Sequence, residues 1–181
     1  MNNPLYVSYH DEEWRQPLHD DQELFELLCM ETYQAGLSWE TVLNKRQAFR
    51  QAFHGYHLRG VAEMSDEELE ALLDNPAIIR NRVKIFATRT NAQAFLQVQA
   101  EFGSFDAYLW SFVEGKTIVN DVLDYRDAPA KTALSEQLAK DLKKRGFKFT
   151  GPVAVLSYLQ AAGLVDDHEN DCEWKGKLND V

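Results

Sequence analysis

Hydrophobic residues recur at helical spacing along most of the chain. Leu24, Leu27 and Leu28 follow the i, i+3, i+4 pattern that places side chains on one face of a helix. Serines at 38, 65 and 104 precede such runs, where helix N-caps are common. The pattern predicts helices over the ranges Asp21 to Tyr33, Ser38 to Phe53, Ser65 to Leu73, Ile78 to Phe102, Phe105 to Val113 and Leu134 to Arg145.

Alternating strand patterns are missing, and the chain is therefore predicted to be all-α. The connection from 114 to 131 is its least regular part. It is either an exposed loop or contains a short strand-like piece at Ile118 and Val119.

Length and composition describe one domain over residues 1–181. With 181 residues, 45% of them hydrophobic, the chain can bury one core, or two small lobes that share a cleft. No run reaches the length of a membrane span, and the first residues do not resemble a signal peptide. Only Cys29 and Cys172 are present, which favours a reducing compartment over a disulfide scaffold. We expect a cytoplasmic protein with no membrane contact.

The charge balance restricts the class of partner. The chain has 29 acidic and 19 basic residues and a formal net charge of −10, which excludes a protein that coats DNA through overall charge. An acidic protein with a local basic patch still binds DNA, with strong salt sensitivity. Any nucleic-acid contact is therefore expected to be local.

One segment has that local basic character, LKKRGFKFTGPV from Leu142 to Val153. It sets Lys143, Lys144 and Lys148 around Gly146 and Gly151, and Arg145 lies among them. Pro152 suits the first position of a helix, where free backbone amides attract anions. The helix, basic turn and second helix predict a clamp for a nucleic-acid backbone, although a lysine and arginine run is also typical of a solvated face.

A second cluster gathers aromatic residues around one carboxylate. Tyr6, Tyr9 and Trp14 precede the helix that ends near Glu31, and Trp39 follows Gly36, which interrupts the helix. Glu31 and Trp39 then lie on either side of a tight connection and can face one cavity. Aromatic residues at such positions also commonly belong to the core.

A third cluster has metal-ligand residue types. His168 and Cys172 share a face of one helical turn, and His10 lies far away in sequence. A structural zinc ion needs four ligands, and Cys29 lies within an apolar helix. Ordinary surface histidine and cysteine residues remain the alternative.

Together these clusters resemble the DNA 3-methyladenine glycosylase I family, the Tag branch of the helix-hairpin-helix DNA glycosylase superfamily. The resemblance covers nearly the whole chain. The segments that carry it are PLYVSYHDEEW, LFELLCMETYQAGLSWETVL, IIRNRVKI, LWSFV, LKKRGFKFTGPV and GLVDDH, of which QAGLSW and KKRGFKF are the most specific.

The resemblance implies a helix-hairpin-helix glycosylase-like fold with two helical lobes flanking a base-binding cleft. A lesion base rotates out of the duplex into an aromatic pocket. Glu31 would accept hydrogen bonds from the methylated adenine, Tyr9 and Trp39 would stack on it, and Tyr6 and Trp14 would lie nearby.

The implied reaction is hydrolysis of the N-glycosidic bond of 3-methyladenine in alkylated double-stranded DNA. Methylation at N3 makes the base a cation and a good leaving group, so water attacks C1′ and an abasic site remains. No lysine nucleophile is needed, and a monofunctional, monomeric hydrolase is expected.

The resemblance also implies the DNA contacts. Amides from Gly146 to Gly151 would hold the backbone, with charge from Lys143, Lys144 and Lys148. Positively charged side chains from 80 to 84 would form a second contact, namely those of Arg80, Arg82 and Lys84. The connection from Gln34 to Leu37 would fill the gap left by the flipped base. Asp166 and Asp167 follow the hairpin but are not expected to be catalytic, because this branch is not thought to depend on an aspartate there.

Zinc is the one departure from the family pattern. Members usually have an early cysteine that joins two histidines and a second cysteine around a structural zinc ion. His10, His168 and Cys172 match three of these ligands, and this sequence has no cysteine ahead of His10. Either water or a nearby group completes the site, or the metal is weaker, or the natural protein has residues that this sequence lacks.

Two other classes of function stay open from the sequence. A noncatalytic module that binds lesions or nucleobases would keep the pocket without turnover. A helical interaction protein would suit the acidic balance but not the basic hairpin, and DNA binding that weakens steeply with salt would exclude it.

Overall fold

The computed structural model describes residues 3–14 and 16–176, and almost all of its regular structure is helical. The all-α prediction is confirmed. The elements in chain order are α1 (Pro4–Ser8), a π-helical turn (Tyr9–Glu13), α2 (Asp21–Tyr33), α3 (Trp39–Asn44), α4 (Arg46–Ala52), a 3-10 turn (His54–Tyr56), α5 (Leu58–Ala62), α6 (Asp66–Leu72), α7 (Arg82–Phe102), α8 (Phe105–Ser111), β1 (Ile118–Val119), a 3-10 turn (Tyr125–Asp127), α9 (Ala133–Lys144), α10 (Pro152–Ala161) and β2 (Val165–Asp166).

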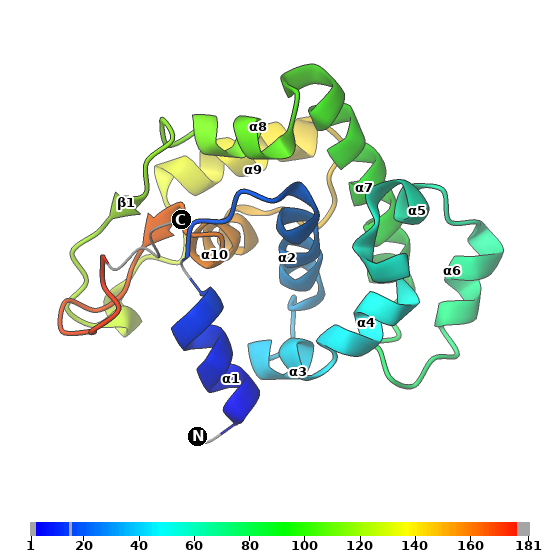
Figure 1. Cartoon of the computed structure of the whole chain (residues 1–181), viewed down its shortest axis with the longest axis horizontal. Coiled ribbons are helices and arrows are strands. Elements are labelled where there is room, and N and C mark those ends of the chain that lie inside the picture. Colours follow the sequence, from blue (N-terminus) through cyan, green and yellow to red (C-terminus); the bar gives the residue numbers. More distant parts are fainter. Residues whose placement is uncertain (1–2, 15, 177–181) are drawn as a thin grey trace.

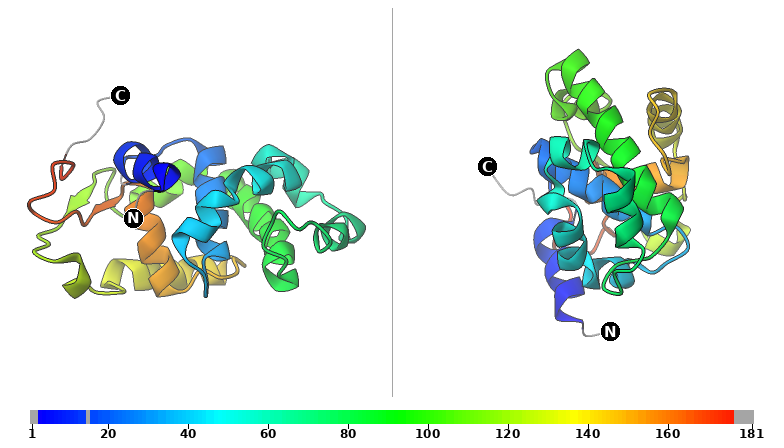
Figure 2. Two further views of the ribbon diagram at one scale, coloured as in Figure 1. Left: turned by 90° about the horizontal axis from the view of Figure 1, so that it is seen from below. Right: turned by 90° about the vertical axis from the view of Figure 1, so that its right-hand side faces the viewer.

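Helix α2 lies in the middle of the molecule, with α4 to α7 on one side and α9, α10 and the strands on the other (Figure 1). The strand pair and α6 lie at opposite ends of the long axis in both Figure 1 and the left view of Figure 2. From Leu24 to Tyr33 nearly every residue of α2 is buried. A helix covered on all sides carries its polar residues into the interior, and this decides the character of Glu31.

Aromatic side chains form much of the core around α2. Tyr33 stacks on Phe49 with ring centroids 4.2 Å apart, and Phe53 and Tyr56 continue the stack. Each ring excluded from water stabilises the fold by about 1.5–3 kcal/mol. The same stack anchors α4 against α2.

The serine caps act as predicted. The side chains of Ser38, Ser65 and Ser104 accept hydrogen bonds from the amides of Thr41, Glu68 and Ala107 at 3.2, 3.1 and 2.9 Å. These bonds satisfy amides that the first helical turn leaves open.

The single helix predicted from Ser38 to Phe53 is wrong, because the structure divides it at Lys45 into α3 and α4. Leu43 and Phe49 are six residues apart. On a straight helix they would point roughly 120° apart, at about 100° per residue. The break at Lys45 lets both side chains enter the core, where they are 5% and 1% exposed.

The predicted start of the long helix at Ile78 is also displaced. Helix α7 begins at Arg82, since the Asn81 side chain accepts the Lys84 amide at 3.1 Å and caps it there. The strand-like piece at Ile118 and Val119 is real. It pairs in parallel with Val165 and Asp166, which lie far along the chain.

Within the described residues, no helix has both the length and the apolar character needed to cross a bilayer.

Candidate active site

Glu31 lies in the last turn of α2 and is buried, with 6% of its surface exposed. Its Oε2 atom has no hydrogen-bond partner among the described residues. Burial penalises the charged form and raises the pKa of Glu31 to about 8. Because the charged form of this buried carboxylate is disfavoured, a cation that enters beside it strongly promotes loss of its proton.

Two aromatic side chains lie next to this carboxylate. Gly36 ends the helical segment with a φ of +80°, and the Ser38 cap starts α3 at Trp39. Tyr9, from the π-helical turn, lies against Trp39 with ring centroids 5.3 Å apart. Like Glu31 Oε2, the Tyr9 hydroxyl and Trp39 Nε1 are buried without a hydrogen-bond partner in the part of the chain that the structure describes. Three unpaired polar atoms around one space mark a polar binding site rather than ordinary core.

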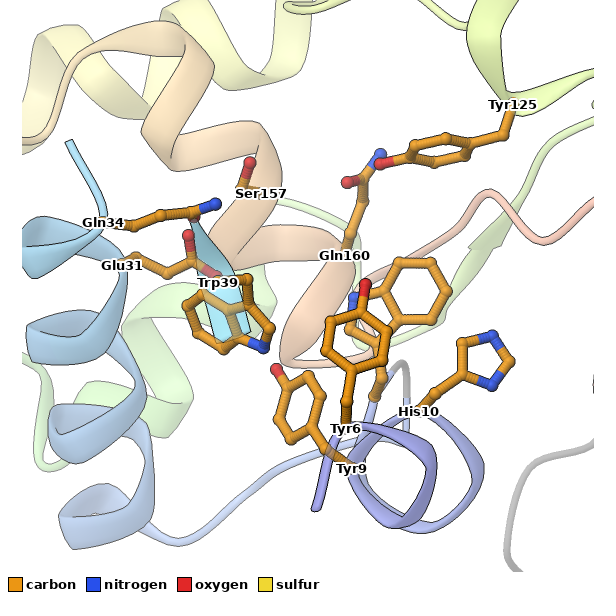
Figure 3. Close-up of a pocket in the computed structure, with 10 residues that line it drawn as sticks. Tyr6, Tyr9, His10, Glu31, Gln34, Trp39, Tyr125, Ser157 and Gln160 are labelled. Carbon is orange, nitrogen blue, oxygen red and sulfur yellow. The ribbon is translucent and has the colours of Figure 1, made fainter. Parts of the chain in front are cut away.

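That space is a cavity of about 180 Å³, a size that suits one small planar ring system (Figure 3). The structure brings the five residues of the predicted aromatic cluster together around it. Its lining consists of Tyr6, Tyr9, His10, Trp14, Glu31, Gln34, Trp39, Tyr125, Ser157 and Gln160.

Sequence reasoning missed the far wall of this cavity. Ser157 and Gln160 come from α10, and Tyr125 comes from the irregular connection before α9. The two α10 residues are polar and three positions apart in an otherwise apolar helix. This spacing puts them on one face and was the available signal.

The basic hairpin has the predicted form. Lys143, Lys144 and Lys148 are exposed, Gly146 has a φ of +94°, and Pro152 opens α10 after Gly151. No side chain of residues 3–14 or 16–176 caps the first turn of α10, so its amides are available to an anion.

Arg145 differs from its basic neighbours, because it is paired with Glu101 and Asp141 at 2.7 and 2.8 Å. It stabilises the packing of α9 on α7 and α8 rather than offering a free charge.

The hairpin lies beside the mouth of the pocket. A groove of about 420 Å³ runs from Glu31 and Gln34 along Ala35 to Phe149 and Gly151. A nucleic-acid strand bound at the hairpin would therefore run past the cavity in which Glu31 lies.

The expected second basic contact needs correction at Lys84. This side chain is buried, and its Nζ atom donates to the carbonyl oxygens of Tyr33 and Ala35 at 2.8 and 2.7 Å. It holds the connection between Glu31 and Trp39 and is not available to phosphate. Arg82 is exposed but paired with Glu70, while Arg80 is exposed.

The three candidate zinc ligands are brought together only in part. The rings of His10 and His168 lie 5.8 Å apart, between centroids. Each histidine has a carboxylate beside it, Asp11 at 2.9 Å and Asp166 at 2.7 Å. Among the described residues, no three histidine, cysteine or acidic side chains form a group able to hold a metal ion. The described residues therefore give no support to the predicted zinc ion, which stays a prediction.

The buried carboxylate lies in an aromatic cavity beside two helices that a basic glycine hairpin joins, which is the arrangement expected of a helix-hairpin-helix DNA glycosylase. The family model for methyladenine glycosylase matches residues 1–175. The chain belongs to this family.

Its relatives are similar over almost their whole length. The DNA-3-methyladenine glycosylase of Haemophilus influenzae is 47% identical over 171 residues, which is 94% of this chain and 92% of that protein. DNA-3-methyladenine glycosylase 1 of Escherichia coli is 45% identical, covering 94% of this chain and 91% of the relative.

Solved structures agree with these relatives. The 3-methyladenine DNA glycosylase I of Staphylococcus aureus has a TM-score of 0.95 and 42% identity, covering 99% of this chain and 95% of its own. A tyrosine-to-phenylalanine variant of such an enzyme, in complex with 3-methyladenine, has a TM-score of 0.95 and 41% identity, covering 99% and 96%.

Proposed function

We propose that this protein is a DNA-3-methyladenine glycosylase, which hydrolyses the N-glycosidic bond of 3-methyladenine in alkylated DNA. It releases the free base and leaves an abasic site. The observation that carries the proposal is the buried, unpaired carboxylate of Glu31 in an aromatic cavity beside the basic hairpin. Family membership and the 3-methyladenine-bound neighbour support the same activity.

The pocket is matched to a cationic base. Methylation at N3 places a positive charge on adenine and weakens its bond to the sugar. Electron-rich ring faces from Tyr9 and Trp39 attract a cation, and Glu31 adds a full negative charge when it is ionised. Neutral adenine lacks this attraction, so the same pocket selects against it.

Glu31 also supplies hydrogen-bond acceptors for the polar edge of the base. Since a cation beside a carboxylate stabilises its charged form, entry of the methylated base lowers the pKa of Glu31 from its raised value of about 8. The proton leaves as the base enters, and the resulting ion pair forms in a site from which water is largely excluded.

The leaving group departs with little help from an acid, so water attacks C1′ directly. None of the ten residues that line the cavity is a lysine. This supports a monofunctional hydrolase without a covalent enzyme intermediate or strand cleavage.

DNA would be held at the hairpin, through its backbone amides and Lys143, Lys144 and Lys148. Leu37 is the large apolar side chain exposed in the connection from Gln34 to Leu37, with 38% of its surface accessible. We propose that Leu37 fills the gap left in the duplex, because an apolar side chain inserted there replaces the stacking that is lost when the base rotates out.

A structural zinc ion and a monomeric state stay predictions. Metal analysis and light scattering on one purified sample measure both. About one zinc ion per chain would support ligation through His10, His168 and Cys172, and a metal-free, active protein would contradict it.

The activity itself is tested by release of free base from methylated duplex DNA, resolved by chromatography. We expect 3-methyladenine to be released while 7-methylguanine stays in the DNA. Tight binding of free 3-methyladenine without any release would instead identify a noncatalytic lesion-binding module.

A further inference from the structure

Gln160 lines the pocket but has no role in the base recognition described above for the aromatic side chains and Glu31. It lies in the last turns of α10, is 5% exposed and lines the cavity. Its Nε2 atom donates a hydrogen bond to Asp167 Oδ2 at 2.6 Å. A buried amide with one end fixed has a defined direction, and that direction matters in a pocket for a charged ligand.

Asp167 is itself held in place. It is 6% exposed, and its second oxygen, Oδ1, accepts a hydrogen bond from Asn120 Nδ2 at 2.7 Å. The Asn120 backbone amide donates to the Asp166 carbonyl oxygen at 3.0 Å, which extends the parallel pairing of β1 and β2. The short strand pair therefore positions a carboxylate whose two oxygens each accept an amide N–H.

This arrangement decides which end of the Gln160 amide meets the pocket. Both side-chain oxygens of Asp167 accept hydrogen bonds, Oδ1 from Asn120 and Oδ2 from Gln160, so the NH₂ group of Gln160 faces Asp167. Its carbonyl oxygen then lies on the other side of the amide. Figure 3 shows that oxygen on the side of the amide that faces Ser157 and Glu31.

We propose that Gln160 presents its amide oxygen to the flipped methylated base, as a second acceptor across the cavity from Glu31, and that Asp167 is the positioning residue that fixes this orientation. The proposal rests on the glycosylase function described above. The negative end of the amide dipole stabilises a cationic base, whereas a half-turn of the amide would direct its NH₂ group at the same cation. The contribution is smaller for a neutral base, so the pair adds to selectivity for the alkylated one.

The test compares Gln160→Met, Asp167→Asn and the double variant in single-turnover excision of 3-methyladenine from duplex DNA. Methionine keeps the length of glutamine and removes the acceptor. Asparagine at 167 both donates and accepts, so Gln160 is free to adopt either orientation. We expect each single variant to lose about tenfold in excision rate with little change in duplex affinity, and the double variant to lose no more than Gln160→Met.

A matched control and a second readout separate this role from a structural one. Asp21→Asn disturbs another aspartate that accepts from a glutamine amide, Gln99 at 2.8 Å, away from the cavity. We expect it to excise at the wild-type rate. Affinity for free 3-methyladenine, which is neutral, is measured by quenching of tryptophan fluorescence. It should fall less than the excision rate, whereas a misshapen pocket would lower both equally.

Several outcomes would overturn the proposal. These are wild-type excision by Gln160→Met, multiplicative effects in the double variant, or equal losses in excision and free-base affinity. If Asp167→Asn does not fold, Gln160→Met with its two readouts, excision rate and free-base affinity, still tests the proposal, because this variant leaves Asp167 unchanged. Failure of the wild-type protein to release 3-methyladenine would instead reject the function itself.

Discussion

At the scale of single residues, Glu31 shows how position sets chemistry. The same carboxylate on an exposed helix face would be ionised at neutral pH, whereas burial in the last turn of α2 raises its pKa to about 8. Because the cationic base pairs with the ionised form, the fraction of active enzyme depends on pH.

We expect kcat/KM for excision to rise with pH and to level off above about pH 8, since this parameter reports the pKa of the free enzyme. Glu31→Gln should remove the pH dependence and lower the excision rate by about tenfold or more, because the amide has no negative charge for the cation. Excision assays across the pH range measure both. A variant that excises as well as the wild type would remove Glu31 from this role.

Glu31 should also make stability depend on pH. Its pKa is near 4.5 when unfolded and about 8 when folded, so the folded state keeps a proton that the unfolded chain releases between these values. The stabilisation is complete below about pH 4.5 and is lost as pH rises through about 8. Relative to Glu31→Gln, the wild type should therefore melt at progressively lower temperature as pH increases. A constant difference in Tm would contradict the raised pKa.

Gly163 gives a prediction that depends on close packing. A Cβ atom there would lie 2.4 Å from the backbone carbon of Gln16, and its φ is +80°. We expect Gly163→Ala to lower the free energy of unfolding by about 3 kcal/mol or more, measured by urea denaturation. Gly115→Ala is the control, since Gly115 has a φ of +75° with open space around it and should cost only about 1 kcal/mol.

At the scale of elements, α7 positions two parts of the site. Lys84 holds the connection after α2 through two carbonyl oxygens. About two turns further along α7, the Asn91 side chain donates a hydrogen bond to the carbonyl oxygen of Lys148 at 3.2 Å. It also accepts one from the Lys148 amide at 2.7 Å. Residues seven apart share a helix face, so one stripe of α7 contacts both the pocket connection and the hairpin.

Replacing Lys84 by Met should therefore weaken the pocket. The buried carbonyl oxygen of Tyr33 and the part-buried one of Ala35 lose their donor, which should cost about 2 kcal/mol of stability. Affinity for free 3-methyladenine should fall because the connection between Glu31 and Trp39 loosens. Lys116→Met, at an exposed position, is the control for loss of a lysine. Unchanged base affinity in Lys84→Met would show that the connection keeps its shape without this contact.

At the scale of the whole molecule, a net charge of −10 confines DNA binding to a few cations. Changing Lys143 and Lys144 to Ala should weaken binding to any duplex and reduce the salt slope of the logarithmic affinity by about 2. Binding of free 3-methyladenine should not change. The double change of Lys116 and Lys131 to Ala alters the net charge equally at exposed sites outside the hairpin and should leave the slope intact. An unchanged slope in the hairpin variant would contradict the assignment of the clamp.

Local interactions determined what the sequence alone could predict. The bounds of α2, the serine caps, the glycine break at Gly36 and the hairpin before Pro152 depend on residues close together in the chain. Glu31 and Trp39 could be predicted to face one cavity for the same reason, because a tight turn joins them.

The tertiary structure decided which distant groups meet. No residue near Lys84 in the sequence indicates that its ammonium group donates to the carbonyl oxygens of Tyr33 and Ala35. From the sequence alone, a basic residue at this position is interpreted as a DNA contact, and only the folded structure shows that it is buried. Likewise, the orientations of the Gln160 amide and the Asp167 carboxylate are fixed only in the folded chain, where the strand pair places Asn120 beside Asp167. Helix propensity, caps and turns act over a few residues, whereas burial and charge depend on neighbours that only the folded chain brings together.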